Sequence, residues 1–134
     1  MRLPPATLAV LVTAASCGIL SPDDPVCLSN SVAGLVIYVQ DSATGASIAA
    51  DAHFIARSGS YVDSTTYPES RYNRADSLPM VGAFEHPGIF QVTVRKPGYQ
   101  DWTRSGIWVR TNRCGHPRTV TLTARLQPAL SAGR

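Results

Sequence analysis

Charge is scarce in this sequence, and no stretch concentrates it. Asp, Glu, Lys and Arg make up only 16% of the 134 residues, and the formal net charge is +3. Nucleic-acid-binding domains carry a clustered basic patch or stripe, whereas no run of five or six like charges occurs here. Dispersed charge of this size is typical of a solvated surface, so we expect no nucleic-acid partner.

Recognisable catalytic and metal-binding motifs are also missing. Gly59-Ser60 has no GxSxG context, the turn that presents the nucleophile in many serine hydrolases. The cysteines show no CxxC spacing, and only the weak pair Cys114 and His116 brings a His close to a Cys. Such a set is poor for a zinc site. We therefore expect no catalytic residue, no metal site and no cofactor.

The one long apolar run lies at the N-terminus and is too short to cross a bilayer. Residues 8–15, LAVLVTAA, follow Arg2 and lead into small residues, which is the layout of a secretory signal. A membrane-spanning helix needs about 20 apolar residues. The sequence therefore predicts a signal peptide over residues 1–16.

Cys17 directly follows the small residues Ala14, Ala15 and Ser16. This order resembles the lipobox of bacterial lipoproteins, although Ala14 stands where that family prefers Leu. The resemblance implies that Cys17 is acylated and anchors the protein to a membrane of the bacterial cell envelope. Gly18 stands where an Asp would retain a lipoprotein at the inner membrane, which favours the outer membrane. Ordinary signal cleavage, which would give a secreted protein, is the alternative.

Three cysteines in an exported chain leave one without a partner. If Cys17 carries lipid, Cys27 and Cys114 remain, and an oxidising compartment would let them form a disulfide. A bridge that closes a loop of about 90 residues contributes on the order of 4 kcal/mol. We favour this bridge over two free thiols because Cys27 precedes the first expected strand and Cys114 lies in a loop before the last.

The mature chain is expected to be a single domain on a tether. Residues 17–32 include two prolines and two aspartates and offer little to bury, which predicts a lipidated tether. Residues 33–128 alternate apolar and polar side chains, and residues 129–134 form a short tail. We expect this domain to be a monomer.

The strand around which the chain is organised is Gly88–Arg95, where Phe90, Val92 and Val94 alternate with polar residues. Lys96-Pro97-Gly98 then ends it with turn chemistry. Residues 61–66 are polar enough to lie at a sheet edge, and Gly106 indicates a bulge. Residues 35–40 are apolar on both faces, which predicts cover on both sides. The other expected strands are 51–57, 80–85, 102–110 and 118–126.

Seven short strands without a helical period predict an all-β fold, an antiparallel seven-stranded Ig-like or transthyretin-like β-sandwich. The alternation assigns its core to one face of each strand. The expected core residues are Leu35, Ile37, Val39, Phe54, Phe90, Val92, Val94, Val120 and Leu122.

Partner contacts are expected from exposed aromatic and arginine residues. The irregular stretch 67–79 is long for a connection in a compact domain, and such loops are often functional. Its mixture of aromatic residues and arginine suits protein or glycan contacts, although a solvated connection is the simpler interpretation. The candidate contact residues are Tyr67, Arg71, Tyr72, Trp102 and Trp108.

Three motifs, taken together, resemble carboxypeptidase regulatory-like domains, and the likeness covers residues 33–128. They are VIYV at 36–39 with Asp41 and TG at 44–45, GAFE at 82–85 with PG at 87–88, and FQVTV at 90–94 with KPGY at 96–99. The resemblance implies a transthyretin-like sandwich that acts as an accessory domain. His53 and His86 lack the Glu of the HxxE motif found in the catalytic domains of metallocarboxypeptidases. We therefore expect a non-catalytic envelope protein that binds a protein or a glycan, or has a structural role.

A small transthyretin-like hydrolase is the alternative function. Hydroxyisourate hydrolases share the expected sandwich and use His and Arg residues, which would point to His86, His116, Arg113 and Arg118 here. They end in YRGS, whereas this chain ends in LSAGR. A shared fold does not by itself carry a function, so the hydrolase is the weaker hypothesis.

Overall fold

The computed structural model describes residues 26–66 and 75–130, and within them the chain is built almost entirely from β-strands. A single 3-10 turn, η1 (Ala75–Ser77), interrupts the strands. The strands are β1 (Ala33–Asp41), β2 (His53–Ser58), β3 (Tyr61–Thr66), β4 (Met80–Phe84), β5 (Gly88–Arg95), β6 (Trp102–Val109) and β7 (Val120–Leu126). Each strand expected from the sequence is confirmed to within about two residues.

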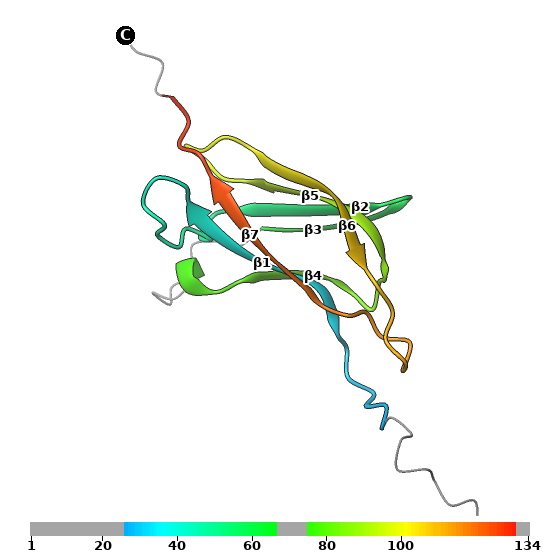
Figure 1. Cartoon of the computed structure of the whole chain (residues 1–134). Coiled ribbons are helices and arrows are strands. Elements are labelled where there is room, and N and C mark those ends of the chain that lie inside the picture. The colour runs from blue at the N-terminus through cyan, green and yellow to red at the C-terminus, as the bar shows by residue number, and fades with distance from the viewer. Residues whose placement is uncertain (1–25, 67–74, 131–134) are drawn as a thin grey trace, which may run out of the picture.

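The seven strands form two sheets that face each other in a sandwich-like arrangement (Figure 1). One sheet has the order β4-β1-β7, and the other has the order β3-β2-β5-β6. The polar strand β3 is an edge strand, as its sequence predicts. The described chain begins at the same end as the β6–β7 loop, whereas its C-terminal end lies at the opposite end of the sandwich (Figure 1).

One strand pair contradicts the expectation of a purely antiparallel fold. β7 runs parallel to β1, with Leu35 opposite Val120 and Asp41 opposite Leu126. Alternation of side chains does not reveal this, because parallel and antiparallel strands share the same period of two. The direction of β7 is set by residues 110–119, which carry the chain from one sheet to the other.

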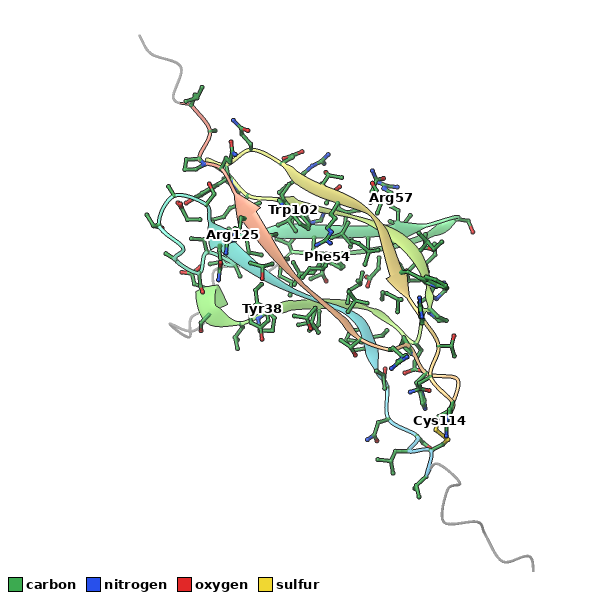
Figure 2. The ribbon with its side chains drawn as sticks, viewed as in Figure 1. Tyr38, Phe54, Arg57, Trp102, Cys114 and Arg125 are labelled. Carbon is green, nitrogen blue, oxygen red and sulfur yellow. A yellow bond between two sulfur atoms is a disulfide. The ribbon has the colours of Figure 1, made fainter. Side chains whose placement is uncertain are left out.

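A single hydrophobic core lies between the two sheets. Phe54 and Phe90 are its largest fully buried side chains, and Figure 2 shows Phe54 between the layers. Full burial of one such side chain contributes roughly 1.5 to 3 kcal/mol. Val120, expected in the core, is only partly buried. The other buried core residues are Leu35, Ile37, Val39, Ala49, Ala52, Ala56, Met80, Ala83, Val92, Val94, Ile107, Val109, Leu122, Ala124 and Leu126.

The sheets approach each other very closely where β4 crosses β2. A Cβ atom added to Gly82 would lie 2.4 Å from Cε1 of Phe54. Beside this contact, the Asp63 carboxylate accepts a hydrogen bond of 2.7 Å from the backbone N–H of Ala83. Gly82 therefore makes room for the ring of Phe54, and Asp63 joins the edges of the two sheets.

The end of the sandwich far from the start of the described chain is held by Asp41. Its Oδ1 accepts hydrogen bonds from the backbone N–H groups of Ala43 and Thr44 at 2.7 and 3.0 Å. The hydroxyl of Tyr99 donates to Oδ2 at 2.9 Å. This donation, and then the two backbone bonds, lower the pKa of Asp41, because they stabilise the ionised carboxylate. One carboxylate thus links the β1 turn to the β5–β6 turn.

The outer face of β1 is more open than its sequence predicts. Tyr38 is 41% exposed, and in Figure 2 it lies on the side of the molecule away from Arg57. No described segment covers Tyr38 to the point of burial, so the expectation of cover on both sides of β1 is wrong at this residue.

Candidate functional site

The outward surface of the four-stranded sheet carries the exposed Trp108 together with two arginines. We call it the Trp108 face and define it by Arg57, Ile89, Gln91, Trp108 and Arg110. Arg57 lies opposite Gln91 on the neighbouring strand, and Ile89 lies opposite Trp108. Strand alternation places these residues on one surface, because the residues between them are buried in the core.

Trp108 stands out from this surface with 58% of its area exposed. The guanidinium carbon of Arg110 lies 4.1 Å from the centroid of the indole ring, which is a cation–π contact. One side of the ring is thus in contact with Arg110, and the exposed remainder faces solvent. Ile89, its cross-strand neighbour, is 63% exposed.

An irregularity in β6 precedes Trp108. The pairing of β5 with β6 shifts register between Phe90 and Val92, which confirms the bulge expected around Gly106. Gly106 has a φ of +70°, and a Cβ added there would meet no atom within 4 Å. The surface two residues before Trp108 therefore carries no side chain and is open.

The charges of this sheet surface are mainly positive. Arg57 and Arg110 form no ion pair with any described residue. Arg95 pairs with Asp101 at 2.8 Å, so the carboxylate at the other end of the surface is already compensated. Asp63 on β3 is turned toward the backbone of Ala83 and does not face outward with these arginines.

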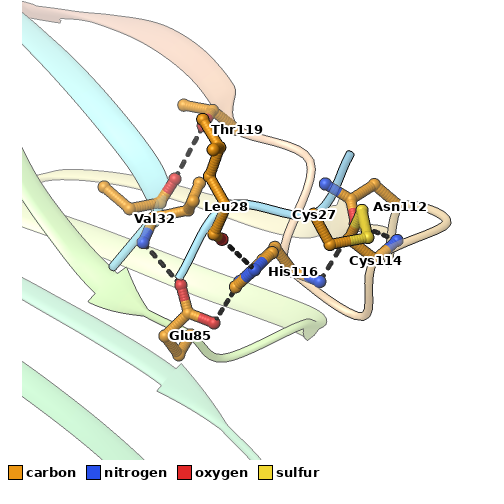
Figure 3. Close-up of polar contacts among 9 residues, drawn as sticks. Cys27, Leu28, Val32, Glu85, Asn112, Cys114, His116 and Thr119 are labelled. Atoms are coloured by element: carbon orange, nitrogen blue, oxygen red, sulfur yellow. Dashed lines mark hydrogen bonds and ion pairs between the residues drawn. A yellow bond between two sulfur atoms is a disulfide. The ribbon is translucent and has the colours of Figure 1, made fainter. Parts of the chain in front are cut away.

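A second cluster fastens the N-terminal segment to the sandwich (Figure 3). Cys27 and Cys114 form a disulfide with a Cα–Cα distance of 5.4 Å, which confirms the expected bridge. Nδ1 of His116 lies 2.7 Å from Oε2 of Glu85, and its Nε2 lies 3.1 Å from the carbonyl oxygen of Leu28. We call these five residues, together with Val32, the N-terminal clasp.

Further hydrogen bonds at the clasp each join one side chain to a backbone group. The N–H of Val32 donates to Oε1 of Glu85, and the hydroxyl of Thr119 donates to the carbonyl of Ala33 at 2.7 Å. Asn112 accepts hydrogen bonds from the backbone N–H groups of Cys114 and His116 at 2.9 and 3.0 Å. The loop that carries His116 is therefore shaped by its own asparagine.

The two ionisable groups of the clasp shift each other's pKa. The hydrogen bond to Glu85 raises the pKa of His116, and burial opposes this only in part. The backbone N–H of Val32, and then His116, lower the pKa of Glu85. Each shift favours the charged form of its group, so the pair is an ion pair under mildly acidic conditions.

An open pocket of about 470 Å³ lies beside the clasp, lined by Cys27, Leu28, Ser29, Asn30, Ser31, Glu85 and His116. Its two ionisable residues are already bonded to each other. In the described part of the chain, no group of three His, Cys, Asp or Glu residues is placed to hold a metal ion. The pocket therefore presents no ligand set for a metal.

The candidate contact residues from the sequence fall into three groups. Tyr67, Arg71 and Tyr72 lie outside the described residues, as does Cys17. Trp102 is partly buried and packs against the core, whereas Trp108 is exposed. Trp108 is thus the tryptophan that a partner can reach most easily.

The residues of the hydrolase hypothesis are engaged in different contacts. The ring of His86 stacks on Tyr61 with a centroid distance of 3.6 Å. His116 uses both ring nitrogens in the clasp. Arg113 and Arg118 line a separate pocket of about 370 Å³ with Thr111 and Asn112. Within the described residues, no hydrogen bond, ion pair or ring contact joins the four residues into one site.

Sequence reasoning missed two residues that matter here. Arg110 lies two positions after Trp108, so strand alternation places both on one surface, and this signal was present in the sequence. Glu85 is 31 residues from His116, and no local pattern indicates their pairing.

Comparison with known proteins adds no family assignment. No protein-family model matches the chain, and no curated protein sequence matches it. In the described part of the chain, no helix has the length and apolar character to cross a membrane.

Proposed function

We propose that this protein is a non-catalytic lipoprotein of the bacterial cell envelope whose β-domain binds a glycan partner through the Trp108 face. The exposure of Trp108 beside a stacked arginine carries the proposal. An indole left 58% exposed on an otherwise well-packed sheet has apolar area available for a ligand. Ile89 and Gln91 extend the contact surface with one apolar and one amide side chain.

We also propose that the fold is a transthyretin-like sandwich related to carboxypeptidase regulatory-like domains. Two facing sheets of three and four strands support it. So do the turn after Asp41, where Gly45 has a φ of +73°, and the turn at Lys96-Pro97-Gly98, where Gly98 has a φ of +81°. These are turns that the resembling motifs contain.

The tether would keep the Trp108 face close to the membrane. If Cys17 is acylated, Cys27 lies ten positions after it, and a fully extended chain of that length spans at most about 35 Å. Cys27 is bonded to Cys114, which is four residues from Arg110. The disulfide therefore provides a short covalent route from the membrane anchor to the Trp108 face.

The anchor is tested by metabolic labelling with radioactive palmitate and by fractionation of the envelope. Wild-type protein is expected to take up label and to remain with the outer membrane. Cys17→Ser is expected to take up no label and to be released. Release of unlabelled wild-type protein into the medium would instead support the secreted alternative.

Partner binding is tested by retention of the protein on isolated envelope fractions. Trp108→Ala is expected to lose retention. Tyr38→Ala, which removes an aromatic side chain from the other sheet, is the matched control and is expected to be retained like wild type. Equal loss in both variants would contradict the proposal. Both proteins carry Cys17→Ser, so that membrane anchoring does not contribute to retention.

A further inference from the structure

We propose that the Trp108 face is a site for an acidic polysaccharide: one sugar ring lies on the indole of Trp108, and sugar carboxylates bind Arg57 and Arg110. This inference rests on the proposed function and names the chemical class of its partner. It depends on three features of the surface: the open part of one ring, two arginines that have no ion-pair partner among the described residues, and the distribution of apolar side chains.

The indole offers one side for stacking. Arg110 occupies one side of the ring at 4.1 Å, yet Trp108 remains 58% exposed. Gly106, two residues earlier, has no side chain, and a Cβ there would meet nothing within 4 Å. The electron-rich face of an aromatic ring attracts the partly positive C–H groups on one side of a pyranose ring. A sugar ring can therefore approach Trp108 over Gly106 without displacing a side chain.

The arginines supply the charge recognition. A guanidinium that stacks on an aromatic ring keeps its N–H donors in its own plane, where they can form a bidentate pair with a carboxylate. Arg110 is held in that way by Trp108. Arg57 lies two strands away and two residues along, which places it about 12 Å from Trp108 by strand spacing alone. Arg110 lies against the Trp108 ring, so the two cations are separate contact points on one surface, and a chain that repeats its carboxylates can bind both.

The pattern of apolar residues favours a glycan over a protein partner. Val62 lies opposite Arg57, and Ile55 lies between Ser64 and Thr93 on the neighbouring strands. Ile89 and Trp108 form one adjacent apolar pair. In the other two rows, the apolar side chains are separated by polar ones. The centre of a protein–protein interface is depleted of charged residues and carries a contiguous apolar patch. Among the described residues of this surface, the pair of Ile89 and Trp108 is too small to form such a centre.

The test is binding of the full mature chain, carrying Cys17→Ser, to polygalacturonate. The fully methyl-esterified form of the same polymer is the matched neutral probe. We expect wild-type protein to bind the acid form at least tenfold more tightly than the ester, and to lose this preference in high salt, because exposed charges are screened. Trp108→Ala should weaken binding to the acid form at least tenfold. Arg57→Gln and Arg110→Gln should each weaken it three- to tenfold.

Two variants on the other sheet serve as controls. Tyr38→Ala and Arg125→Gln remove one exposed aromatic and one arginine from the opposite surface, and both should bind within twofold of wild type. Thermal melting of every variant checks that the fold is intact. Trp108→Gln replaces Trp108→Ala if the latter does not fold.

Several outcomes would overturn the inference. If the acid and the ester bind equally well and both need Trp108, the proposed recognition of charge is rejected, while the proposed function stays in place. Equal losses in the control variants, or no binding of wild type at millimolar sugar, would also reject it. Binding to vesicles of anionic phospholipid without binding to polygalacturonate would assign the arginines to a membrane surface instead. If Trp108→Ala also leaves envelope retention unchanged, the proposed function fails as well.

Discussion

His116 sits between two hydrogen-bond acceptors, the carboxylate of Glu85 at 2.7 Å and the carbonyl of Leu28 at 3.1 Å. A neutral imidazole carries a proton on only one nitrogen, so it can donate to only one of them. The doubly protonated ring donates to both, which is why the site raises the pKa of His116. The fit of the N-terminal segment on the sandwich therefore depends on the charge of this ring.

The first prediction is a pH window for the N-terminal clasp. The pKa of His116 is raised above 6.5, so its contribution is complete below that value and is lost as pH rises through the raised pKa. The pKa of Glu85 is lowered below 4.5, so its contribution is complete above that value and is lost as pH falls through the lowered pKa. The clasp should be tightest between about pH 4.5 and 6.5.

Amide hydrogen exchange at Val32 measures this directly, because its N–H donates to Glu85. Protection relative to the unfolded chain should be greatest inside the window and should decline on the alkaline side. In His116→Gln, protection of the Val32 amide should be lower at every pH, and it should no longer decline on the alkaline side. If protection in wild type is flat from pH 5 to 9 after correction for the intrinsic exchange rate, the role of His116 is rejected.

The second prediction concerns the disulfide. Cys27 and Cys114 are separated by 87 residues, and in the chain-entropy model the loss of such a bridge costs about 4 kcal/mol. The double variant Cys27→Ser with Cys114→Ser should therefore unfold at a markedly lower urea concentration than its parent, in a background that carries Cys17→Ser. The Cys17→Ser parent unfolded in urea with a reductant is the matched control and should behave in the same way as the double variant. A change below about 1 kcal/mol would show that the bridge adds little beyond the packed strands.

Much of this fold could be read from local patterns. Phe90, Val92 and Val94 alternate with polar residues, and burial of one strand face follows from that alternation alone. Turn-forming residues such as Pro97 and Gly98 indicated where the strands end. Cys27 and Cys114 could be paired because lipid on Cys17 would leave only those two cysteines.

The relationships that were not predictable join distant parts of the chain. His116 is 88 residues from Leu28, and nothing near either residue indicates the contact. The parallel pairing of β7 with β1 depends on the path of residues 110–119, and side-chain alternation does not indicate strand direction. Arg110 is different, because its place beside Trp108 follows from the period of two and was open to prediction.

The third prediction concerns Asp41 and Tyr99. The Tyr99 hydroxyl is the largest cause of the lowered pKa of Asp41. The stability that this pairing contributes is present above pH 3.8 and is lost as pH falls through the lowered pKa. Tyr99→Phe should be less stable than wild type near neutral pH. This difference in stability should become smaller in strong acid, where Asp41 is protonated in both proteins. Asp41→Ala should cost more than Tyr99→Phe, because it also removes the acceptor for Ala43 and Thr44.

Thermal melts from pH 2 to 7 check this ordering. Glu85→Gln is the comparison, since it removes the other carboxylate with a lowered pKa while leaving Asp41 in place. An identical difference between Tyr99→Phe and wild type at every pH would mean that the hydroxyl does not stabilise the ionised carboxylate.

The fourth prediction tests the close approach of the sheets at Gly82. Its φ is not in the left-handed region, so alanine meets no backbone strain there and the cost is one of space. The added Cβ would lie 2.4 Å from the Phe54 ring, which has to shift within a packed core. Overpacking of this kind costs about 1 to 3 kcal/mol. Gly82→Ala should lower the free energy of unfolding by that amount in urea denaturation.

A double-mutant cycle with Phe54→Leu separates this contact from other effects of the substitution. Phe54→Leu alone should destabilise the protein, because it shortens the largest side chain of the core. With leucine at that position the Cβ of alanine has room, so adding Gly82→Ala should cost much less than it does beside phenylalanine. The double variant should therefore lose less stability than the sum of the losses in the two single variants, as expected of residues in direct contact. Strict additivity would place the cost of Gly82→Ala elsewhere, for instance at the carboxylate of Asp63, which lies 2.7 Å from the same Cβ position.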